Sequence, residues 1–166
     1  MLNILEVKHY DVVNGPGIRT SIWTAGCNNH CKGCWSPHTW NPNQGSPVEF
    51  VSHTIEDYLK DSKTDGISIL GGDPFYCLMN DDENGALQLI ALLRLCKFHK
   101  KNVWVWTGYL YDNLKIKSQQ LLGDSCWIAD LIDVLVEGPF IESKKDLTLD
   151  WRGSSNQRLL DMSQYR

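Results

Sequence analysis

The sequence has no long hydrophobic run, no excess of basic charge and no internal repeat, and each absence removes a class of protein. None of the 166 residues belongs to a stretch approaching the roughly 20 apolar residues that a membrane-spanning helix needs. The net charge of −4 gives no general attraction to nucleic acid or to an anionic membrane. Near the N-terminus, Glu6, Lys8 and His9 interrupt any apolar segment of the secretory type. We therefore expect a cytoplasmic protein that binds neither nucleic acid nor membrane.

The composition is that of an ordinary globular chain. Hydrophobic residues make up 42% of it and charged residues 22%. A chain of this length fits one domain with a core of its own, and no linker-like or low-complexity tract divides it. We expect a single domain over residues 1–166.

Strand-like and helix-like segments alternate along the chain. The apolar spacing predicts strands over 18–24, 67–70, 102–108 and 132–138, and helices over 46–60, 85–100 and 109–122. Such alternation predicts an α/β fold whose mostly parallel strands are joined through helices. In these folds the loops at the carboxyl ends of the strands build the ligand site. The tail over 151–166 has no assigned element.

A fourth cysteine is missing from the stretch CNNHCKGCW, which runs from Cys27 to Trp35 and holds Cys31 and Cys34 as well. Thiolates are soft ligands that suit zinc, copper(I) and iron–sulfur clusters. A structural zinc site needs four ligands, and His38 could supply the fourth. A ferredoxin-type cluster needs a fourth cysteine and a different spacing. The third possibility is a 4Fe-4S cluster bound at three irons, whose fourth iron is open to a ligand.

The other cysteines are scattered over the chain, at Cys77, Cys96 and Cys126. Isolated cysteines of a cytosolic protein are more often small buried hydrophobic residues than ligands. We expect that role for all three.

A second candidate segment is GGDP, from Gly71 to Pro74, which follows the expected strand over 67–70. Glycine lets the backbone approach a ligand closely, and the Asp73 carboxylate can accept hydrogen bonds from an ammonium group. Taken alone, the segment is a turn after a strand. One strand away from the cysteines, it becomes a candidate binding segment.

These motifs together resemble a known family. The spacing CxxxCxxC resembles the radical S-adenosylmethionine superfamily, and NGPGIRTSIW (14–23) resembles a segment of glycyl-radical enzyme activases. The segments VWVWTGY (103–109), IDVLVEG (132–138) and WRGSSNQR (151–158) extend the similarity over nearly the whole chain. The combination is similar to the activating proteins of anaerobic, class III ribonucleoside-triphosphate reductases, their phage-encoded versions in particular.

The resemblance implies a fold and an activity. The fold would be an incomplete, open (β/α) barrel, and Cys27, Cys31 and Cys34 would bind a 4Fe-4S cluster through which they serve catalysis. S-adenosylmethionine would bind the open iron and be split by one electron into methionine and a 5′-deoxyadenosyl radical. That radical would take hydrogen from a glycine of the large reductase subunit. The electron would come from a flavodoxin or a ferredoxin-type protein.

The resemblance also implies which residues contact the cofactor. Gly33, Cys34 and Trp35 would lie against S-adenosylmethionine, and Gly71, Gly72 and Asp73 would lie near its methionyl end. Two positions depart from the family pattern: Asp73 stands where glutamate is usual, and Lys32 where activases often have proline, which affects the stiffness of the loop. Arg152, Asn156 and Arg158 would serve either docking and cofactor contacts or packing of the tail.

Two other functions remain open at this point. One is an activase for a different glycyl-radical enzyme. The other is a non-catalytic zinc or iron–sulfur module, which would not respond to S-adenosylmethionine.

Overall fold

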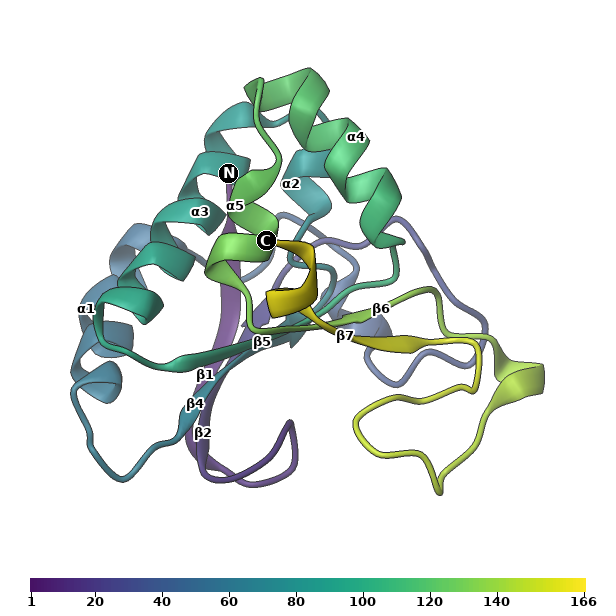
Figure 1. Ribbon diagram of the computed structural model, residues 1–166, viewed down its shortest axis with the longest axis horizontal. Coiled ribbons are helices and arrows are strands. Elements are labelled where there is room, and N and C mark those ends of the chain that lie inside the picture. Colours follow the sequence, from purple (N-terminus) through teal and green to yellow (C-terminus); the bar gives the residue numbers. More distant parts are fainter.

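One seven-stranded sheet organises the computed structural model, which describes residues 1–166 (Figure 1). Its strands are β1 (Asn3–Asp11), β2 (Arg19–Thr24), β3 (Ser46–Pro47), β4 (Gly66–Gly71), β5 (Asn102–Trp106), β6 (Val134–Glu137) and β7 (Arg158–Asp161). They are ordered β3-β1-β2-β4-β5-β6-β7 across the sheet. The sheet is open, because β3 and β7 form its two edges.

The centre of the sheet is parallel. Strands β2, β4, β5 and β6 pair in parallel, in that order, and they are the four strands predicted from the sequence. Antiparallel strands extend both sides, with β1 and β3 beyond β2 and β7 beyond β6. The predicted α/β class and the parallel centre are therefore confirmed.

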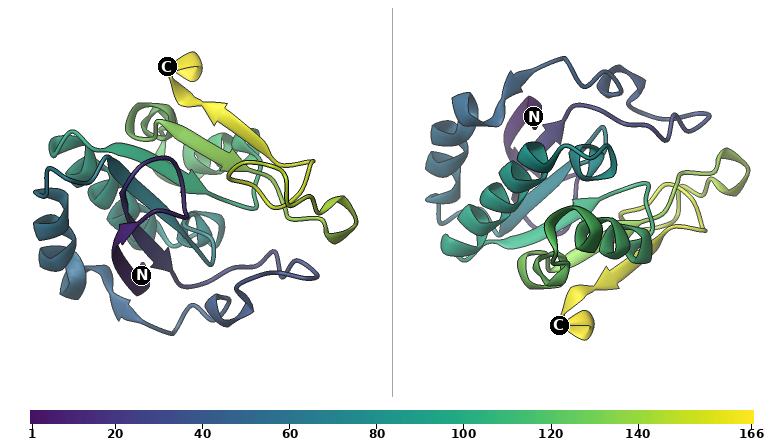
Figure 2. Two further views of the ribbon diagram at one scale, coloured as in Figure 1. Left: turned by 90° about the horizontal axis from the view of Figure 1, so that it is seen from below. Right: turned by 90° about the horizontal axis from the view of Figure 1, so that it is seen from above.

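The helices lie on one side of the sheet (Figures 1 and 2). They are α1 (Val48–Leu59), α2 (Tyr76–Met79), α3 (Glu83–Phe98), α4 (Tyr111–Leu122) and α5 (Cys126–Leu131). The three long helices match the predicted ones to within two residues. Helix α3 begins two residues early because the Asp82 carboxylate accepts a hydrogen bond from the Gly85 amide and caps the helix. No helix combines the length and the apolar character needed to cross a membrane.

Five strands and α-helices were not predicted: β1, β3, α2, α5 and β7. Strand β3 occupies Ser46 and Pro47, which were predicted as the start of the first helix. Four of the five elements are only two to six residues long, too short to show a hydrophobic period. Strand β1 did carry a signal, because exposed Glu6 and Lys8 alternate with the partly buried Val7. That alternation is typical of a strand with one polar face.

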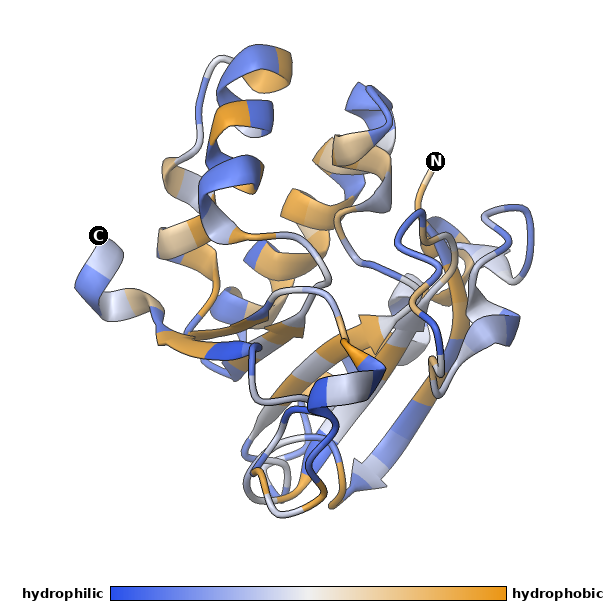
Figure 3. Ribbon diagram, turned by 90° about the vertical axis from the view of Figure 1, so that its right-hand side faces the viewer, coloured by the Kyte–Doolittle hydropathy of each residue, from blue (hydrophilic) through white to orange (hydrophobic).

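One face of the sheet packs against the helices, and the other face lines a cavity. Buried side chains such as Ile67, Ile69, Val103 and Val105 belong to a core of 27 buried residues packed with the helices. Figure 3 shows hydrophobic residues in several of the strands and on parts of the helices. Because side chains alternate along a strand, the intervening residues point to the opposite face. On that face Trp23, Leu70 and Trp106 line a cavity.

Candidate functional site

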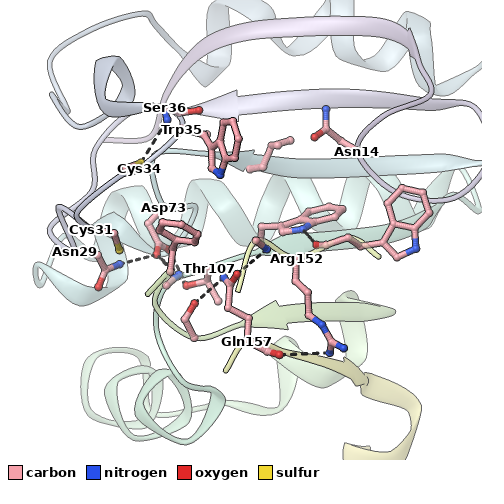
Figure 4. A pocket seen from close by; sticks show the side chains of 18 of the residues that line it. Asn14, Asn29, Cys31, Cys34, Trp35, Ser36, Asp73, Thr107, Arg152 and Gln157 are labelled. Atoms are coloured by element: carbon pink, nitrogen blue, oxygen red, sulfur yellow. Dashed lines mark hydrogen bonds between the residues drawn. The ribbon is translucent and has the colours of Figure 1, made fainter. Parts of the chain in front are cut away.

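A cavity of about 650 Å³ lies at the carboxyl ends of the parallel strands (Figure 4). The loop after each of these strands contributes to its lining, for example Cys27 after β2, Asp73 after β4, Thr107 after β5 and Gly138 after β6. Residues 139–157, here called the β6–β7 loop, form another large part of the wall. The strand residues Trp23, Leu70 and Trp106 and the segment before β2, with Val13 and Asn14, complete it. The predicted edge of the sheet is therefore where the structure has its main cavity.

Nearly all the predicted site residues line this cavity. The lining includes Cys27, Cys31, Cys34, Trp35, Gly71, Gly72 and Asp73. Gly33 does not line it, because its Cα faces the side chain of Glu142 from the β6–β7 loop. The structure thus brings both candidate motifs, the cysteine loop (residues 27–35) and GGDP, to one place.

The three thiols have N–H donors or buried surroundings that suit iron–sulfur ligands. The Ser36 amide donates to Cys34 Sγ over 3.4 Å, and the Asn29 side chain donates to Cys27 Sγ over 3.8 Å. Hydrogen bonds to sulfur are one of the means by which proteins tune such clusters. Burial raises the pKa of the Cys27 and Cys31 thiols, so without metal they are protonated at neutral pH. Metal binding would displace these protons.

The spacing of the donors bears on which metal group fits. No three Cys, His, Asp or Glu side chains are close enough to hold one metal ion. A tetrahedral zinc ion would bring its thiolates to about 2.3 Å, and therefore to roughly 3.8 Å from one another. In a 4Fe-4S cluster each cysteine binds a different iron, so the sulfurs stand farther apart. His38 is exposed and lies outside the cavity. The donor set fits a multi-iron cluster better than zinc.

Asp73 is the most enclosed polar side chain of the cavity wall, with 1% of its surface exposed. Its carboxylate accepts hydrogen bonds from the Thr107 hydroxyl (2.9 Å), the Gly108 amide (2.8 Å), the Phe75 amide (3.1 Å) and the Asn29 side chain (3.3 Å). Burial raises the pKa of Asp73 to about 6, although these hydrogen bonds oppose the rise. One carboxylate thus connects the loops that follow β2, β4 and β5.

The two glycines of GGDP are required by close packing. A Cβ on Gly72 would lie 2.4 Å from the carbonyl oxygen of Gly26 and 2.9 Å from that of Thr39. Gly71 has a φ of +112°, a conformation that side chains strongly disfavour. The conformation of Gly71 and the close packing around Gly72 explain why both residues are glycine. The backbone of both residues lines the cavity.

The Gln157 side chain makes several hydrogen bonds within the β6–β7 loop and to the end of β6. Its Oε1 accepts hydrogen bonds from the amides of Gly153 (2.9 Å) and Ser154 (3.2 Å). Its Nε2 donates to the carbonyl oxygen of Gly138 over 2.9 Å. Gln157 therefore ties the returning half of the loop to the end of β6.

Comparison with known proteins agrees with this geometry. A family model described as a 4Fe-4S single cluster domain matches residues 13–160. The chain is 40% identical over 159 residues to the anaerobic ribonucleoside-triphosphate reductase-activating protein of Escherichia coli K12, covering 94% of this chain and 96% of that protein. It is 39% identical to the protein of that name from Vibrio cholerae, over 94% and 96% of the two chains. The corresponding protein of Enterobacteria phage T4 is 32% identical, over 95% and 93%.

The chain belongs to the family of anaerobic ribonucleoside-triphosphate reductase-activating proteins. The matched 4Fe-4S model covers the cysteine loop and all four parallel strands. An iron–sulfur cofactor, as expected from the three cysteines, agrees with this membership.

In this activating-protein chain, WRGSSNQR forms most of the returning half of the β6–β7 loop. Asn156 donates to the carbonyl oxygen of Pro139 over 2.7 Å, and Arg158 pairs with the buried Glu137. These two side chains pack the loop, whereas Arg152 lines the cavity. Gln157 was not singled out from the sequence, because its hydrogen bond to the Gly138 carbonyl oxygen spans 19 residues and a local pattern carries no sign of it.

The remaining cysteines lie outside the cavity lining. Cys77 and Cys96 are buried, as predicted, but Cys126 is exposed at the start of α5. The prediction of burial was therefore wrong for Cys126. It fails because α5 is a short helix whose inward positions are taken by Trp127, Ile128 and Ala129.

Proposed function

We propose that this chain is a radical S-adenosylmethionine activase. It uses a 4Fe-4S cluster and S-adenosylmethionine to install a glycyl radical on the large subunit of an anaerobic ribonucleotide reductase. Cys27, Cys31 and Cys34 hold the cluster. The observation that carries the proposal is their arrangement: three thiols and no fourth cysteine line one cavity, in a chain that matches a 4Fe-4S domain.

The cofactors supply chemistry that protein side chains lack. Held by Cys27, Cys31 and Cys34, a 4Fe-4S cluster would supply the one-electron reduction of S-adenosylmethionine, and with it the radical chemistry needed to remove an α-hydrogen from glycine. The chain's own residues would bind the two cofactors, orient them and enclose them. Trp23, Leu70 and Trp106 give the cavity an apolar floor, which would favour exclusion of water around a bound ligand.

Two segments are proposed to hold S-adenosylmethionine. The cavity volume of about 650 Å³ is typical of sites for ligands of this size. Trp35 and the backbone around Gly33 and Cys34 form one side. The backbone of Gly71 and Gly72 forms the other, with the negative charge of Asp73 behind it. Because the Asp73 oxygens already accept four protein donors, its attraction to a methionyl ammonium acts mainly through charge.

The open sheet supports a macromolecular substrate. We infer that it represents an incomplete (β/α) barrel within a single domain over 1–166, whose open side lets a segment of the large reductase subunit reach the cavity. A flavodoxin or ferredoxin-type protein is proposed as the electron donor.

The proposal is tested by anaerobic incubation of the reconstituted, reduced protein with S-adenosylmethionine and a candidate partner. We expect the electron paramagnetic resonance doublet of a glycyl radical on the large subunit of an anaerobic ribonucleotide reductase. A doublet that appears only on another glycyl-radical enzyme would show that this other enzyme is the partner. The absence of a radical on every candidate would refute the activase assignment and favour a non-catalytic module.

A further inference from the structure

The cysteine loop makes few hydrogen bonds of its own. Between residues 27 and 35 the single backbone–backbone bond runs from the Cys34 amide to the Cys31 carbonyl oxygen, over 3.0 Å. No helix or strand lies in this segment. The positions of the three thiols therefore depend on contacts between the loop and the rest of the chain.

The first half of the loop is anchored to the GGDP side of the molecule. The Asn28 side chain donates to Asn80 Oδ1 over 2.9 Å, and the Asn29 side chain donates to Asp73 Oδ2 over 3.3 Å. Both contacts precede Cys31. They leave the second half, from Cys31 to Trp35, without an anchor on this side.

The second half is anchored to the β6–β7 loop, which runs beside it in both views of Figure 2. Lys32 Nζ lies 3.2 Å from Glu142 Oε2. Lys145 Nζ lies 4.4 Å from the centroid of the Trp35 ring, a cation–π contact. The two contacts flank Cys34 on either side.

Glu142 also fits closely against the backbone of the cysteine loop. Gly33 has a φ of +74°, and a Cβ there would lie 2.9 Å from Glu142 Oε1. The backbone of Phe140, two residues before Glu142, forms a hydrogen bond with the Cys31 thiol. The Lys32–Glu142 pair therefore lies where the β6–β7 loop contacts the backbone of the cysteine loop.

We propose that Lys32 and Glu142 are positioning residues whose ion pair latches the cysteine loop to the β6–β7 loop. The latch holds Cys34 at the cavity wall and slows the opening that exposes the cluster to solvent. It rests on the proposed function only in assuming that the cysteines hold a cluster. Lys32 is 91% and Glu142 48% exposed, so charge reversal changes the opening equilibrium by about two- to fivefold, as for other exposed pairs.

Charge reversal in a double-mutant cycle tests the latch. The variants are Lys32→Glu, Glu142→Lys and the double reversal, and the readout is the rate of iron release from the reconstituted protein to a ferrous chelator at low ionic strength. We expect each single reversal to speed release about two- to fivefold and the double reversal to restore the original rate. About 1 M salt should remove the differences.

The matched control is another exposed ion pair, Lys60 with Glu56 on helix α1, whose charged atoms lie 3.5 Å apart. Neither residue lines the cavity. Reversal of this pair should leave iron release unchanged. Single reversals at Lys32 and Glu142 without effect, or a double reversal that releases iron as fast as the singles, would overturn the latch.

A second readout needs no cluster. In the cluster-free protein, the rate of alkylation of Cys34, followed by peptide mass, should rise in the single reversals and return in the double. If the protein holds no cluster, the proposed function fails while this measurement still decides the latch. Equal alkylation in all four proteins would refute it.

Discussion

Burial of the Asp73 carboxylate lets one side chain join the loops that follow three parallel strands. Its partners are Asn29 in the cysteine loop, Phe75 after GGDP, and Thr107 and Gly108 after β5. The cost of this position is desolvation, which raises the pKa to about 6. The motif GGDP predicted a carboxylate at the site, but its protein partners come from separate parts of the chain and were not visible in the sequence.

The raised pKa makes a prediction about stability. Between pH 4 and 6 the folded state holds a proton on Asp73 that the unfolded state has lost, so this group's contribution to stability falls as the pH rises. For a shift from 3.8 to about 6, the loss approaches about 3 kcal/mol. The free energy of unfolding of the cluster-free protein, minus that of Asp73→Asn, should therefore fall by roughly this amount between pH 4 and 7. Parallel stability curves for the two proteins would contradict the account.

The cysteines give a second prediction at this scale. Replacement of Cys27, Cys31 or Cys34 by alanine should abolish the brown absorption of the reconstituted protein, because a cluster with two protein ligands is poorly held. Cys126→Ala is the control, since this cysteine is exposed and lies outside the cavity. Visible absorption and iron content measure the result. Loss of the cluster in Cys126→Ala would show that the three-ligand arrangement is incomplete.

At the scale of elements, the β6–β7 loop is the part that the sequence revealed least. The helices α1, α3 and α4 and the central strands follow from hydrophobic spacing, and the carboxyl-end rule placed the cavity correctly. The sequence of this loop has no hydrophobic period. Its conformation depends instead on side-chain contacts between residues that are distant in the sequence. Gln157 reaches Gly138, and Trp106 donates to the Trp151 carbonyl oxygen over 2.7 Å.

Gln157 therefore provides the prediction for this element. Gln157→Ala removes the acceptor of the Gly153 and Ser154 amides, at a cost of about 1–3 kcal/mol. Hydrogen exchange at these two amides should become about tenfold faster or more. Gln119→Ala is the control, because its side chain makes one exposed hydrogen bond, to Gly123. Unchanged exchange at residues 153 and 154 would show that other contacts hold the loop.

At the scale of the whole molecule, the topology places the hydrophobic core and the cavity on different sides of the sheet. The helices and one face of the sheet build the core, and the opposite face, the strand ends and the β6–β7 loop build the cavity. The sheet is not closed into a barrel, and we propose that its open side admits a segment of another protein to the cavity. The family relationship and the cavity both point to chemistry delivered to a protein partner.

The central claim is that the missing fourth cysteine leaves one iron free for S-adenosylmethionine. Electron paramagnetic resonance of the reduced, reconstituted protein tests it, with S-adenosylmethionine carrying ¹⁵N in its methionyl amino group. The account predicts that the cofactor changes the cluster spectrum and that a hyperfine coupling to ¹⁵N appears. A cluster spectrum that is the same with and without the cofactor, and that shows no such coupling, would contradict it.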